Sequence, residues 1–65
     1  MRFKLNSPVE TEVKEVIARS AKTAILEYVK SQDGIVLMIG WTKRVAKANV
    51  IIADLNFEVT AMIVD

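Results

Sequence analysis

An unbroken run of five bulky apolar residues, Ile35–Ile39, constrains the fold of this chain more than any other feature. Gly34 and Gly40 bound the run on its two sides. A short apolar run without polar alternation is typical of a strand buried on both faces, as in a parallel sheet that helices cover. We therefore expect Ile35–Ile39 to form the central strand of a small sheet.

The size of the chain limits how much apolar surface one copy can bury. It has 65 residues, of which 52% are hydrophobic. That length fits a single domain over residues 1–65, and a domain of this size buries only about 60% of the surface that its unfolded chain exposes. We therefore expect a homodimer or a larger homo-oligomer, in which the copies bury a shared apolar face.

Residue types that the sequence lacks exclude several kinds of chemistry. There is no Cys and no His, so disulfides, thiolate metal sites and the commonest general base are missing. No serine has an activating partner at a recognisable spacing. The carboxylates Glu10, Glu12, Glu15 and Glu27 belong to the exposed face of an expected helix. We expect a protein that is not an enzyme and holds neither a metal nor a cofactor.

Hydropathy along the chain also bears on where the protein works. No apolar run approaches the ~20 residues that a membrane span needs, and the first eight residues lack the apolar core of a secretory leader. Together with the absence of Cys, this pattern predicts a cytoplasmic protein that does not insert into membranes.

A short strand and a long helix are predicted ahead of the apolar run. Phe3 and Leu5 alternate with polar residues, which predicts a strand over Arg2–Asn6. Ser7–Glu10 has the S-x-x-E form of a capping box with Pro at the first helical position, and the helix should end near Ser31. At the turn that follows, Gly34 is available for a left-handed conformation. The helix should bury a stripe formed by Val9, Val13, Val16, Ile17, Ala21, Ala24, Ile25 and Tyr28.

The segment 43–55 has two interpretations. Val45, Ala48, Ile52 and Leu55 recur at helical spacing, which favours a second helix and a small α/β domain of β-α-β-α-β order. Alternation from residue 53 to 63, together with β-branched residues at 50–52, favours one long terminal strand instead. That alternative gives an α+β domain of β-α-β-β order, with one long helix on a sheet.

With a second helix, the chain resembles the Alba superfamily and its relative, the stage V sporulation protein S family. Asn6–Val9 is similar to the first turn of that family, and Gly40 with Thr42–Ala48 is similar to its second loop and helix. The family's first turn usually bears lysines, whereas this chain has Asn6 and Ser7 there, so that contact is not carried over. The resemblance implies a dimer that binds DNA or RNA without catalysing a reaction.

The candidate binding residues follow directly after the apolar run. Lys43, Arg44 and Lys47 form a basic segment, and at the start of a helix they would meet phosphates together with free backbone amides. Trp41 either stacks on a base or packs at the end of the strand. The net charge of only +1 is far from the strong basic excess of a typical nucleic-acid-binding domain.

A second class of function stays open alongside nucleic-acid binding. It is a structural, self-assembling module whose apolar face meets copies of itself or another protein. Dodecin-like β-α-β-β assemblies, which can hold a flavin against Trp, are one such form. Residues 43–54 discriminate the two classes, because a helix there favours nucleic-acid binding and a strand there favours self-assembly.

Overall fold

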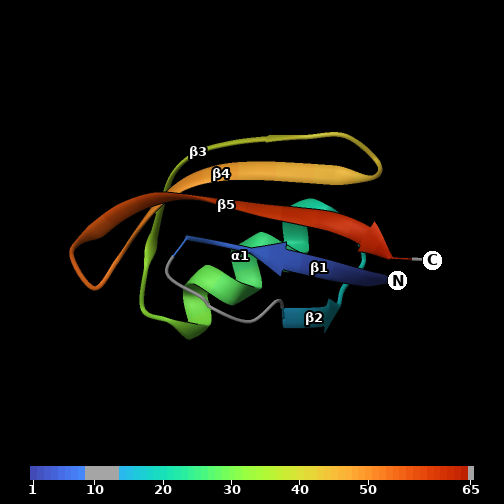
Figure 1. Cartoon of the computed structure of the whole chain (residues 1–65), viewed down its shortest axis with the longest axis horizontal. Helices are drawn as coiled ribbons and strands as arrows, with labels where there is room; N and C mark the ends of the chain where they lie inside the picture. The colour runs from blue at the N-terminus through green and yellow to red at the C-terminus, as the bar shows by residue number, and fades with distance from the viewer. Residues whose placement is uncertain (9–13, 65) are drawn as a thin grey trace.

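The structure, a computed structural model, describes residues 1–8 and 14–64. In that part of the chain a single helix packs on a five-stranded antiparallel sheet, so the fold is mixed α+β (Figure 1). The elements are β1 (Arg2–Asn6), β2 (Lys14–Ile17), α1 (Ala21–Ser31), β3 (Ile35–Trp41), β4 (Val45–Ile52) and β5 (Leu55–Val64). The predicted β-α-β-α-β order is therefore wrong. The alternative β-α-β-β order differs as well, because the segment that it assigns to one long terminal strand forms two strands, β4 and β5, joined by a tight turn.

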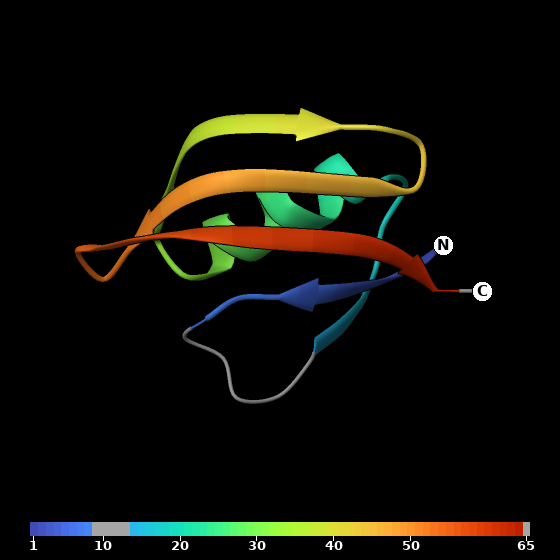
Figure 2. The same cartoon turned by 45° about the horizontal axis from the view of Figure 1, so that its top comes forward.

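The strands lie in the order β2-β1-β5-β4-β3, and every neighbouring pair is antiparallel. Figure 2 shows this order, with α1 behind the sheet. Strands β3, β4 and β5 follow one another through two tight hairpins, while β5 returns beside β1. Consequently β2 and β3 form the two edges of the sheet in the described residues.

The helix begins later than the sequence pattern predicts. Lys14–Ile17 pairs with β1 as a strand, with Phe3 opposite Val16, and α1 starts only at Ala21. Its N-cap is Ser20, whose Oγ accepts a hydrogen bond from the Thr23 N–H at 3.1 Å. Of the expected capping box and stripe, residues 9–13 lie outside the described residues.

The core lies between α1 and one face of the sheet. Phe3 and Val59 from the sheet and Ile25 from the helix are fully buried, and Tyr28 is buried as expected. Alanines where the helix meets the strands let the two layers approach closely. The buried residues are Phe3, Leu5, Ala21, Ala24, Ile25, Tyr28, Val29, Ala46, Ala48, Val50, Val59 and Ala61.

Two segments after α1 have structures that differ from the predicted ones. Ile35–Ile39 is part of an edge strand and not a central strand buried on both faces, because β5 and not β3 pairs with β1. Residues 45–52 form β4 and not a second helix. Ala53 and Asp54 close the hairpin to β5 with φ of 52° and 65°, the positive values that a tight type I′ turn requires.

Candidate assembly surface at the edge of the sheet

The predicted basic site forms the tip of the β3–β4 hairpin. Lys43 and Arg44 lie there side by side and exposed. The Thr42 N–H donates to the carbonyl oxygen of Val45 at 2.7 Å, and the Thr42 Oγ1 accepts from the N–H groups of Arg44 and Val45 at 3.3 Å. These bonds fix the loop. Because β4 follows it, Lys43 and Arg44 do not have the free amides of a helix start beside them.

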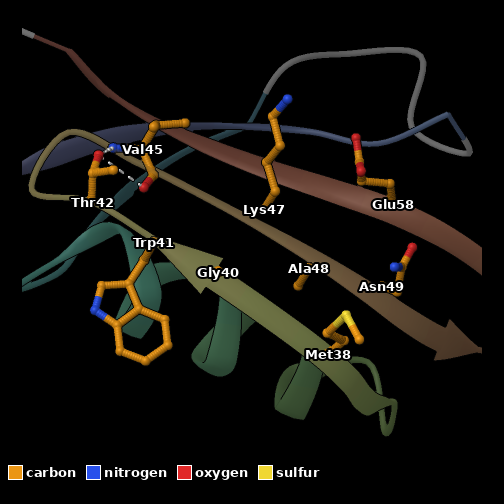
Figure 3. Close-up of a pocket in the computed structure, with 9 residues that line it drawn as sticks. All are labelled: Met38, Gly40, Trp41, Thr42, Val45, Lys47, Ala48, Asn49 and Glu58. Atoms are coloured by element: carbon orange, nitrogen blue, oxygen red, sulfur yellow. Dashed lines mark hydrogen bonds between the residues drawn. The ribbon is translucent and has the colours of Figure 1, made fainter.

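The other two predicted residues point to opposite sides of the sheet. Lys47 lies within β4 on the side that faces away from α1, called here the open face, and is exposed. Trp41 ends β3 on the side of the helix, where the Lys22 Nζ lies 4.0 Å from its ring centroid. Figure 3 shows Lys47 and Trp41 pointing apart. The structure therefore brings Lys43 and Arg44 together but separates Lys47 and Trp41.

Gly40 leaves space on the open face. It is the register partner of Lys47, and Met38 is the partner of Asn49, so all four positions share that face. A Cβ added at Gly40 would meet no atom within 4 Å. A hollow of about 390 Å³ lies at this position (Figure 3), lined by Met38, Gly40, Trp41, Thr42, Val45, Lys47, Ala48, Asn49 and Glu58.

The two edges of the sheet differ in length and in charge. At one edge, β2 has four residues in the part of the chain that the structure describes, and it carries Lys14 and Glu15. At the other, β3 has seven residues and no charged side chain. Short, charged edges discourage pairing with another chain, whereas long apolar edges invite it. The exposed apolar side chains of β3 are Ile35 (61% exposed), Leu37 (54%), Met38 (70%) and Trp41 (54%).

Backbone groups of β3 point towards this edge, called here the free edge. The Thr42 N–H donates to Val45, and hydrogen-bonded and non-hydrogen-bonded positions alternate along antiparallel strands. Gly40 therefore directs its N–H and C=O towards β4, while Ile39 and Trp41 direct theirs to the free edge. Within residues 1–8 and 14–64, no strand pairs with that side of β3.

Sequence reasoning missed this edge as a site. It identified the apolar run as a strand but assigned it to the centre of the sheet. The alternation from residue 53 to 63 signals the last strand, but β3 is outermost because β5 pairs with β1, a tertiary arrangement that this local pattern does not reveal.

Comparisons with known proteins leave the function to be argued from this chain's own residues. No family model matches the sequence, and no curated protein or solved structure matches it either. Among the residues that carry the resemblance to Alba, Thr42–Ala48 lie in a hairpin loop and a strand, where the resemblance implies a helix. Nowhere in the described residues is there a helix long and apolar enough to cross a membrane.

Proposed function

We propose that this protein is a non-catalytic, self-assembling module whose copies associate through the free edge of β3. One observation carries the proposal: β3 is long, uncharged and apolar, while β2 at the opposite edge is short and charged. A strand edge supplies main-chain hydrogen bonds for affinity and alternate side chains for specificity. The strand conformation of residues 45–52 also favours this class over nucleic-acid binding.

The exposed apolar side chains of β3 support association. Ile35, Leu37, Met38 and Trp41 are each more than half exposed in one copy. Removing apolar surface from water is favourable by roughly 25 cal/mol per Å², so association through β3 would be stabilised by burying part of these side chains.

The first test is the mass of the protein in solution. We expect sedimentation velocity and native mass spectrometry to give a species of at least twice the chain mass between about 1 and 100 μM, a range that brackets a micromolar Kd. A monomer throughout that range contradicts the proposal.

A matched pair of lysine variants locates the surface. Met38→Lys places a charge on the edge strand β3, and Ile17→Lys makes the same kind of change on β2, where the side chain is also exposed. Lysine on an edge strand opposes pairing. We expect Met38→Lys to weaken association at least tenfold and Ile17→Lys to change it less than twofold. Equal effects would remove β3 from the proposal.

Nucleic-acid binding is a second candidate, favoured by the exposed pair Lys43 and Arg44 on a loop that hydrogen bonds hold in place. Each phosphate neutralised by a cation adds about −0.9 to the slope of log K against log salt for duplex DNA. This candidate predicts a slope of about −2 per copy and its loss in Lys43→Glu/Arg44→Glu. Titrations of mixed duplex DNA and single-stranded RNA at low salt measure both, and absence of binding to either rejects it.

A further inference from the structure

We infer that the partner at the free edge is a second copy of this chain, paired antiparallel with β3 about a two-fold axis that passes between the Gly40 residues of the two copies. The inference rests on the proposed function and adds its register. The two sheets would join into one continuous ten-stranded sheet with both helices on the same side.

The backbone favours this register. Ile39 and Trp41 both direct their N–H and C=O groups outward. With the axis at Gly40, Ile39 of each copy faces the partner's Trp41, and the two copies form four main-chain hydrogen bonds. A bulge between Val36 and Met38 breaks the regularity of β3. A register shifted towards Ile35 would place that bulge inside the new pairing, whereas an axis at Gly40 uses only the regular stretch after it.

The side chains are compatible with the same register. On the helix side, Ile39 would lie beside the partner's Trp41, an aromatic and β-branched pair of the kind that stabilises antiparallel strands. Trp41 is more than half exposed in the single copy, so it has surface to bury. On the open face, Gly40 would meet the partner's Gly40, and the hollows of the two copies would become continuous across the axis.

Few charges lie at the paired strands. Strand β3 has no charged side chain. On the helix side, Lys22 of each copy lies beside its own Trp41, with its Nζ 4.0 Å from the ring centroid. The nearest cation in this row is Lys47, one strand inward from Gly40. Three strand spacings of about 4.8 Å would separate it from the partner's Lys47 by about 14 Å. This exceeds the Debye length of about 8 Å at physiological salt.

Cysteine crosslinking tests the register, because the natural chain has no Cys. In the inferred pair the two Gly40 residues form a non-hydrogen-bonded pair with Cα atoms about 4.5 Å apart, within the range that a disulfide spans. Gly40→Cys should therefore form a covalent dimer under mild oxidation. The added side chain meets no atom within 4 Å in one copy, so the fold should tolerate it.

Met38→Cys is the matched control on the same face of β3. The two Met38 residues of the inferred pair would lie four positions apart along the strands, about 13 Å, which is too far for a disulfide. We expect Gly40→Cys to crosslink at least tenfold faster than Met38→Cys, with unchanged far-UV circular dichroism in both. An equimolar mixture of the two variants should give little mixed dimer.

Other results overturn the inference in distinguishable ways. Equal crosslinking of Met38→Cys, or a mixed dimer that forms faster than the Gly40→Cys dimer, would place the axis elsewhere. If the mass measurements still show a dimer in that case, only the inferred register is wrong and the proposed function stands. A chain that stays monomeric by mass and does not crosslink removes both.

Discussion

Replacing Gly34 by Ala tests a close approach between the helix end and the sheet. A Cβ at Gly34 would lie 2.6 Å from the Cγ1 of Ile52 and 2.9 Å from both the Val29 Cγ1 and the carbonyl oxygen of Ile51. The two methylene or methyl groups can move, but the carbonyl oxygen belongs to the backbone of β4. Inserting a carbon into such a site costs typically 1–3 kcal/mol. We therefore expect Gly34→Ala to lose about 2 kcal/mol of unfolding free energy.

That loss is large for a domain of this size. At roughly 0.05–0.15 kcal/mol per residue, the whole chain has a stability of about 3–10 kcal/mol. A loss of about 2 kcal/mol lowers the Tm by roughly 10 °C. Urea unfolding followed by far-UV circular dichroism measures it directly. Because association stabilises the folded state, each variant should be compared with the wild type at several protein concentrations.

Gly40→Ala is the matched control. Neither glycine has a positive φ, so the two positions differ in the space available to a side chain and not in backbone strain. Nothing lies within 4 Å of a Cβ at Gly40, and Ala is better than Gly inside a strand by about 0.5–1 kcal/mol. We expect this variant to match or slightly exceed the wild type. Unchanged stability in Gly34→Ala, or an equal loss in Gly40→Ala, would refute the packing argument.

Three further variants test other parts of the structure. Trp41→Pro removes the outward N–H as well as the indole, whereas Trp41→Ala removes the indole alone. The Pro variant loses two hydrogen bonds per dimer, about 2 kcal/mol, and should associate at least tenfold more weakly than the Ala variant in sedimentation velocity. Equal affinities of the two variants would argue against β3 pairing. Ser20→Ala removes the acceptor of the Thr23 N–H and should lower the unfolding free energy by about 1 kcal/mol in urea; no change would mean that the cap does not hold the helix. Ala53→Asn places a residue suited to positive φ where Ala has a φ of 52° and should raise that free energy by about 0.5–1 kcal/mol, whereas a decrease would contradict the turn assignment.

The sequence predicts the first strand, the end of the helix and the alternating last strand, because each depends on a local pattern. It does not predict where the helix begins. Val16 and Ile17 fit a helical stripe, but their pairing with β1 places them in a strand. Ser20 is itself a residue type favoured at N-caps, and that signal was outweighed by the capping-box pattern at Ser7.

The helix ends where the sequence predicts, but the role of Gly34 in the turn differs from the predicted one. The turn after Ser31 was predicted with Gly34 in the left-handed conformation. In the structure Asp33 has the positive φ of 55°, while the Gly34 N–H donates to the carbonyl oxygen of Val29 at 2.9 Å. Gly34 is needed because β4 passes so close, a constraint that arises from tertiary contacts and that no local pattern reveals.

The position of β3 in the sheet also depends on tertiary contacts. The prediction of a strand at Ile35–Ile39 is correct, but hydrophobicity alone does not distinguish a buried central strand from an exposed edge strand. Of the residues at helical spacing, Ala48 faces α1, whereas Val45 lies on the open face, and the β-branched residues at 50–52 favour the strand that forms. Once residues 45–52 form a strand, β3 lies at the edge because the pairing of β5 with β1 leaves it at the far end of the β3-β4-β5 hairpins.

The distribution of charge between the open face and the free edge decides how copies can associate. The open face carries Lys4, Lys47 and Glu58, all exposed, while β3 carries no charge. Stacking two open faces against each other would remove these ions from water, and the desolvation would oppose association. Pairing along β3 leaves them in solvent and buries main-chain groups and apolar side chains instead. In the described residues one helix covers one face of the sheet. Of the two arrangements, the proposed association at the edge is therefore the less costly one.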